Sequence, residues 1–194
     1  MTQDDKPKRE IALKFLEITR ADFRQRVELK QQVVIVYAGA IAAILGFVLQ
    51  NFSRNPAFLN ILWVVPLLAL LAASFFADHM LATTGLAKYQ RNALEPLLRP
   101  EATIPLWDFH PAMNTLKSIF WTLQLGQELL ICVPATLSLA VACVCFVRHW
   151  NALSTPVRVI ELFLALFGLF CLVTAFVLLR KIRRDTRIFG PGLA

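Results

Sequence analysis

The chain has 194 residues, of which 57% are hydrophobic and 17% charged, and its net charge is +7. This composition excludes an ordinary soluble domain, which has fewer apolar and more charged residues. The apolar residues are gathered in four blocks, a pattern typical of a polytopic membrane protein. We therefore expect an all-α fold, because a backbone exposed to lipid must satisfy its own hydrogen bonds.

The whole chain is expected to form a single membrane domain, without a cleavable signal peptide because residues 1–32 contain no short apolar region. Its segments in chain order are a cytosolic amphipathic helix (1–32), a first span (33–50), a second span (57–78), cytosolic helices with a loop (79–127), a third span (128–148), a fourth span (158–180) and a basic cytosolic tail (181–194).

The lysines and arginines are distributed unequally among these connections. Of the 20, eight lie in residues 1–32, four in 82–127 and five in 180–187, which leaves three for the two remaining connections. Basic connections stay in the cytoplasm, so we expect a bacterial inner-membrane protein with both termini inside. Tyr89 and Trp107 should then face the cytoplasm, and Arg54 and Asn151 the outside. Topology and attraction to an anionic lipid bilayer account for the charge, so a nucleic-acid partner is not expected.

Residues 8–49 predict one long helix, because no Gly or Pro separates the charged segment from the first span. Such a helix is about 60 Å long, and a third or more of it would protrude from the bilayer. The alternative is an amphipathic helix that lies on the membrane surface. Six acidic residues among the first 32 favour the protruding helix.

Small residues follow one another at helical spacing in the first span, as Gly39, Ala42, Ala43 and Gly46. Small-xxx-small pairs let helices approach closely in lipid. We expect these residues to pack helices together in a homo-oligomer, although the pattern is equally compatible with packing inside one chain.

The second span, Ile61–Ala77, contains an interior Pro66 and continues into a polar helix. Leu86, Tyr89 and Leu97 keep one side of that helix apolar. We expect this stripe to pack against Phe15, Phe23 and Val27 of the first helix. The helix should end at Pro96 and Pro100, because proline disfavours helix in the residue before it.

Asp78 and His79 stand where the second span ends, as a possible functional polar pair. A carboxylate beside an imidazole could move a proton or bind a ligand, or could simply hydrogen-bond a neighbouring helix at the water boundary. Glu128 opens the third span, and Arg91 or Lys117 is its expected partner if it forms an ion pair.

The second half of the chain offers three further local patterns. The aromatic segment 104–111 is expected to be extended, and Pro134 to kink the third span. Arg158 and Glu161 are three residues apart on one helix, so a local ion pair is expected, with a charged outer vestibule as the alternative.

Motifs that carry catalysis are missing from the sequence. It has no Gly-x-Ser-x-Gly elbow, no phosphate-binding glycine loop and no His-Glu-x-x-His pair. The four cysteines lie within spans, where they serve as packing residues rather than as a disulfide framework. We therefore expect a protein that is not an enzyme and has no catalytic residue, metal site or cofactor.

Basic residues remain on the cytosolic helices once their apolar stripes are packed together. We expect a cytosolic partner protein with an acidic surface to bind them, because opposite charges steer and orient docking. These partner-binding residues are Arg20, Arg24, Arg26, Lys88 and Arg91.

The order of features resembles that of small four-helix bacterial membrane proteins of antiphage defence systems. The resemblance is carried by the charged first helix, by Asp78, by Tyr89-x-x-Asn92-x-Leu94-x-Pro96-x-Leu98 and by Trp107-Asp108, where such proteins usually have Trp-Glu. The group includes membrane effectors of nucleotide-signalling defence and the membrane subunit of the Kiwa system. All 194 residues are taken up by spans and connections, so direct nucleotide sensing is not expected.

The resemblance implies a self-associating inner-membrane protein that senses or disrupts the membrane together with a cytosolic partner. A small-molecule or ion channel or transporter is the alternative, and a membrane-embedded enzyme is a third class.

Overall fold

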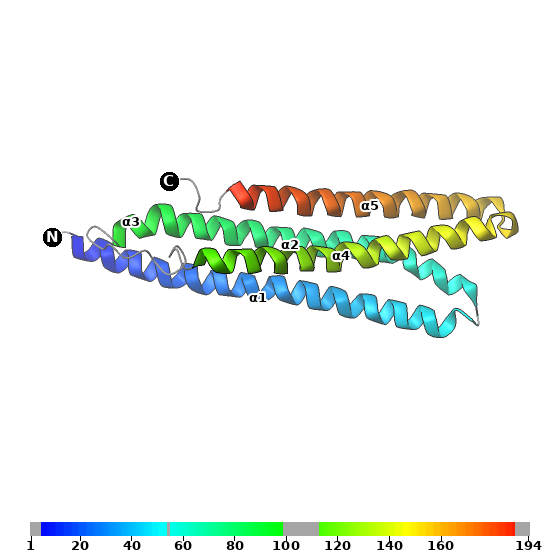
Figure 1. Cartoon of the computed structure of the whole chain (residues 1–194), viewed down its shortest axis with the longest axis horizontal. Helices are drawn as coiled ribbons and strands as arrows, with labels where there is room; N and C mark the ends of the chain where they lie inside the picture. The colour runs from blue at the N-terminus through cyan, green and yellow to red at the C-terminus, as the bar shows by residue number, and fades with distance from the viewer. Residues whose placement is uncertain (1–4, 54, 99–112, 189–194) are drawn as a thin grey trace.

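The computed structural model describes residues 5–53, 55–98 and 113–188, and every element within them is helical. The elements are α1 (Asp5–Asn51), the 3-10 helix η1 (Pro56–Trp63), α2 (Val64–Tyr89), the π-helical turn η2 (Gln90–Leu94), α3 (Glu95–Leu98), α4 (Met113–His149), the 3-10 turn η4 (Trp150–Ala152) and α5 (Thr155–Ile188). The four long helices lie side by side in an elongated bundle, in which α1 begins and α5 ends at the same end (Figure 1).

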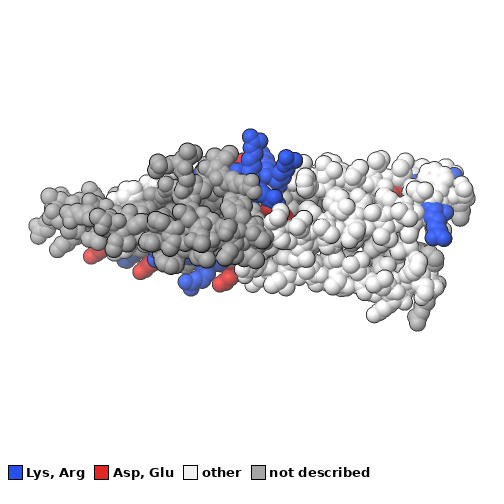
Figure 2. All heavy atoms as spheres, in the orientation of Figure 1, with Lys and Arg blue, Asp and Glu red and all other residues white. Residues whose placement is uncertain are grey.

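Four helices are long and apolar enough to cross a membrane, so the predicted all-α fold with four transmembrane helices is confirmed. They cover Glu10–Asn51, Phe58–Leu94, Gln124–His149 and Thr155–Asp185. Charged side chains gather toward the end of the bundle where α1 begins, which we call the charged end, and a broad uncharged surface covers much of the other half (Figure 2). The aromatic segment 104–111 lies outside the described residues.

The central helix of the bundle is α2, which contacts α1, α4 and α5. Its buried face is rich in alanine, and Ala69, Ala72 and Ala73 share a core cluster with Ala135 of α4 and Ala175 of α5, both fully buried. Small side chains bring helix backbones close together, which is how helices gain van der Waals contact in lipid. Close packing within the chain therefore depends on the alanines of α2, at Ala69, Ala72, Ala73 and Ala77.

Gly168 of α5 lies at a close approach to α4 and α2. A Cβ added to it would lie 3.0 Å from Leu139 Cδ1 and 3.5 Å from Pro66 Cγ. Pro66 itself is buried in the first turn of α2, so it is not an interior break. A proline is tolerated there because the first N–H groups of a helix have no partner within the helix. The residues before it form the 3-10 helix η1, where the sequence predicted a plain α-helix.

The helix continues past Pro96, the first of the two prolines at which it was expected to end. It passes through the π-helical turn η2 and continues in α3 as far as Leu98. Pro96 has no N–H to offer the carbonyl four residues earlier, and the wider π-helical turn lies directly before it.

Helix α4 remains helical at its interior Pro134. There the Tyr37 hydroxyl donates to the Ile131 carbonyl oxygen at 2.8 Å and ties α1 to α4.

The long first helix is confirmed, since α1 is continuous from Asp5 to Asn51. Its charged part packs against η2 and α3, which favours the protruding helix over one that lies on the membrane surface. The predicted packing stripe is partly wrong, because Phe15, Phe23 and Tyr89 are exposed. The buried residues of the two segments are Ala12, Leu16 and Thr19 of α1 and Gln90 and Leu94 of η2. Gln90 Nε2 donates a hydrogen bond to Thr19 Oγ1 at 3.2 Å.

Candidate functional site

A groove between α1 and α2 lies beside the predicted polar pair. Its volume is about 410 Å³, and it is lined by Leu29, Gln32, Val33, Val36, Tyr37, Ala40, Leu68, Ala72, Phe75 and His79. Eight of these ten side chains are apolar or aromatic, and the two strongly polar ones, Gln32 and His79, lie toward the charged end. The groove is therefore apolar along most of its length and polar at one end.

The structure separates the side chains of Asp78 and His79. Asp78 is exposed and does not line the groove, whereas His79 is half-buried and does. Consecutive residues on a helix point about 100° apart, which accounts for the separation. The His79 Nδ1 atom is buried and has no hydrogen-bond partner among the described residues. A buried polar atom without a partner raises the free energy of the fold, so a water molecule, an ion or a ligand that bonds to it is stabilising.

Lys30 lies at the same level on the other side of the contact between α1 and α2. Its Nζ is 5.5 Å from the centre of the Phe76 ring and 3.6 Å from Met80 Sδ. The cation is thus directed at an aromatic face and a sulfur atom and away from the groove.

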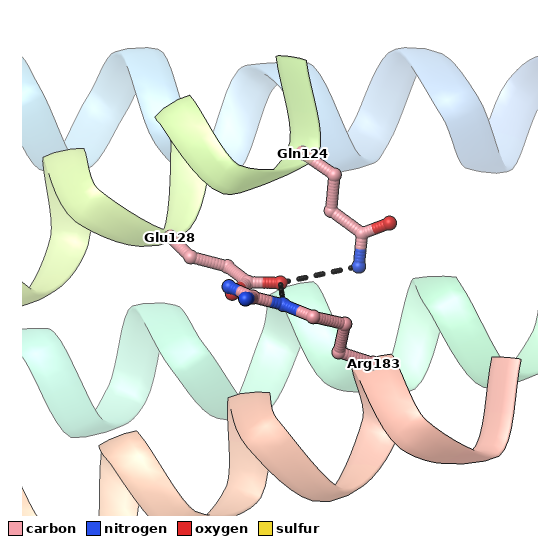
Figure 3. A network of polar contacts seen from close by, with 3 residues as sticks. All are labelled: Gln124, Glu128 and Arg183. Carbon is pink, nitrogen blue, oxygen red and sulfur yellow. Dashed lines mark hydrogen bonds and ion pairs between the residues drawn. The ribbon is translucent and has the colours of Figure 1, made fainter. Parts of the chain in front are cut away.

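Glu128 forms a polar network with two other side chains (Figure 3). Its carboxylate pairs with the Arg183 guanidinium of α5, and it accepts a hydrogen bond from Gln124 Nε2 at 3.2 Å. Glu128 is 5% exposed, so the guanidinium offsets a charge that could not remain buried alone. The expected partners were Arg91 and Lys117, whose side chains lie outside the described ones, and the observed partner is Arg183.

The pairing of Glu128 with Arg183 could have been predicted from the positions of the two residues along the bundle. Glu128 opens the predicted third span, and Arg183 follows the end of the fourth. Because α4 and α5 are antiparallel, both residues come to the same level. A cavity of about 230 Å³ adjoins the pair and is lined mostly by apolar side chains of α4 and α5.

The opposite end of the bundle has its own polar contact. Glu161 is 7% exposed and accepts a hydrogen bond from Trp63 Nε1 at 2.7 Å. Arg158 instead donates to the Leu153 carbonyl oxygen at 2.9 Å and lies over the Trp150 ring. The expected ion pair between Arg158 and Glu161 is therefore not formed in the described residues. Trp63 itself is buried within the bundle.

The predicted partner-binding residues lie along α1, α2 and η2. Arg20, Arg24 and Lys88 are exposed, and the Arg91 side chain lies outside the described ones. Arg26 Nε is 3.4 Å from Asp22 Oδ1, one turn earlier on the same helix. Arg26 is thus half-buried in a local ion pair and presents less of its charge to a partner.

The predicted oligomer-packing residues face away from the rest of the chain. Gly39, Ala42 and Ala43 are exposed, and Gly46 is half-buried. A Cβ added at Gly39 or Gly46 would meet no atom within 4 Å. Of the two possibilities that the sequence left open, packing inside one chain is therefore not what these residues provide.

The described residues contain no group of three or more His, Cys, Asp or Glu side chains placed to hold a metal ion. The polar contacts at both ends join helices, and the groove offers an apolar surface with an imidazole at one end. The polar contacts can hold the helices together, and the groove can accommodate a long apolar molecule. Comparisons with protein-family models, curated proteins and solved structures give no match for this chain.

Proposed function

We propose that this chain is a non-catalytic, oligomeric subunit of a bacterial inner-membrane sensor or effector, of the kind used in antiphage defence, and that it acts with a cytosolic partner protein. The observation that carries the proposal is the helical extension at the charged end. There α1 packs against η2 and α3 beyond the uncharged surface, and forms a platform of two joined helical segments.

The platform has the surface that a protein partner requires. Leu13 and Phe23 of α1 are 46% and 37% exposed, and Arg20 and Arg24 are exposed on the same side of that helix. Apolar side chains with basic neighbours provide an area to bury and a charge to orient an acidic partner. The hydrogen bond from Gln90 to Thr19 holds the two segments together, so the platform is pre-organised.

Self-association is the second component of the proposal, and the small outward face of α1 supports it. Changing both Ala42 and Gly46 to Leu should prevent close approach of two copies and reduce the oligomer to a smaller species. Mass photometry in detergent measures this, with Ala140→Leu on the exposed face of α4 as the control. A monomeric parent protein, or an oligomer that persists in the double variant, would remove these residues from the interface.

The partner claim is tested by reversing charge on the platform. Arg20→Glu combined with Arg24→Glu should abolish co-purification of the cytosolic protein and protection of cells against phage, while membrane insertion stays intact. Arg184→Glu changes an exposed arginine of α5 near the same end and should leave both unchanged. If the double variant keeps its partner and its protection, the platform has no such role. Ion flux through liposomes that contain this protein alone would instead favour the channel or transporter.

A further inference from the structure

The groove between α1 and α2 has the length of one leaflet of a bilayer. It extends from Leu68 to His79 on α2 and from Leu29 to Ala40 on α1, eleven residue steps on each helix. At a rise of about 1.5 Å per residue this is about 16 Å, close to half of a hydrocarbon core that is about 30 Å thick. Both helices cross the membrane, so the groove follows the direction of lipid chains.

The width of the groove suits a single hydrocarbon chain. A volume of about 410 Å³ spread over about 16 Å gives a cross-section of about 25 Å². Carbon atoms pack at about 4 Å from one another, so an extended alkyl chain needs roughly 16 Å². A helix from another protein is about 10 Å across and would need three times the cross-section available here. An alkyl chain fits the space, and a whole helix does not.

The polar end of the groove lies where a lipid carries its polar atoms. His79 and Gln32 line that end, toward the charged extension of the bundle, and the remaining length is apolar. The buried Nδ1 of His79 has no hydrogen-bond partner among the described residues. An imidazole nitrogen can donate to an ester or phosphate oxygen, and the amide of Gln32 adds a second donor.

We propose that this groove binds one acyl chain of a bilayer phospholipid, from the leaflet at the charged end, with the ester or phosphate oxygens of the lipid hydrogen-bonded to His79. The site does not depend on the proposed defence function. Its ligand comes from the surrounding membrane, because the groove opens sideways on membrane-crossing helices.

The test uses the full-length protein in vesicles of phosphatidylethanolamine and phosphatidylglycerol that contain phosphatidylethanolamine with a diazirine on one acyl chain. After illumination, mass spectrometry locates the labelled peptides. Preferential labelling of residues 29–40 and 68–79 is expected. Ala40→Phe fills the groove and should reduce that labelling to the level of the exposed face of α5. Ile35→Phe adds a ring on the same helix at a residue that is 69% exposed and outside the groove, and should not reduce it.

A second variant examines the polar end without adding bulk. His79→Leu should weaken retention of phosphatidylethanolamine about fivefold in native mass spectrometry, the effect of one lost hydrogen bond. Asp78→Asn, next to it but outside the groove, should not. The proposal would be overturned by labelling that is spread evenly over all lipid-facing helices. It would also be overturned if the groove peptides are labelled less than α5, the result expected when a second copy of the chain covers the groove. Unchanged lipid retention in His79→Leu would overturn the role of the imidazole, and this result remains decisive if Ala40→Phe does not fold.

Discussion

Single residues decide how the helices of this bundle are joined at its two ends. At the charged end the carboxylate of Glu128 meets the guanidinium of Arg183, and at the other end the carboxylate of Glu161 accepts from the indole of Trp63. Each contact joins two helices that are far apart in the sequence. Both carboxylates are buried, so each contact is costly to break from one side only.

The pair of Glu128 and Arg183 gives a residue-scale prediction. Arg183→Met should destabilise the protein by about 2–3 kcal/mol, less than for a fully buried pair because the Arg183 side chain is 28% exposed. Adding Glu128→Gln should recover most of that loss, because no buried charge then remains and the side chain can still bond to Gln124. Thermal unfolding in detergent measures both. Equal losses in the single and double variants would show that the charge on Glu128 needs no partner.

At the scale of elements, the sequence predicted the helices well and their contacts only in part. Apolar block length and the absence of Gly and Pro predicted α1 and all four spans, because these features act locally. The sequence left open whether the small residues of α1 pack within the chain or between copies. Gly39 and Ala42 are exposed, and the alanines of α2 make the packing within the chain. Which face of a helix is buried depends on its neighbours, and no local pattern contains that information.

The close approach of α5 to α4 at Gly168 gives the element-scale prediction. Gly→Ala in a helix normally stabilises by about 0.5–1 kcal/mol, and Gly85→Ala should show this gain because its new Cβ meets no atom within 4 Å. At Gly168 the new Cβ would lie 3.0 Å from Leu139 Cδ1, so the gain should be reduced or reversed. Combining Gly168→Ala with Leu139→Ala relieves this contact. Similar gains at Gly85 and Gly168, seen as parallel shifts in melting temperature, would contradict the tight contact.

At the scale of the whole molecule, the candidate site was predictable only as a position along the bundle. The sequence placed Asp78 and His79 at the boundary of a span, but the groove beside His79 is formed by α1 and α2 together. Likewise, the partner of Glu128 became evident only when α4 and α5 were placed side by side. The charged end and the uncharged half, in contrast, follow directly from charge and hydropathy along the chain.

The central claim is that the four helices cross the membrane with the charged end in the cytoplasm. A variant without the four native cysteines, carrying one new cysteine at either Tyr89 or Asn151, tests it most directly, since both residues are exposed and lie at opposite ends of the bundle. An impermeant thiol reagent on intact cells should label the cysteine at position 151, and should label that at position 89 only after the membrane is opened. Labelling at position 89 but not at position 151 in intact cells would invert the topology, and equal labelling at both would contradict the membrane-spanning arrangement itself.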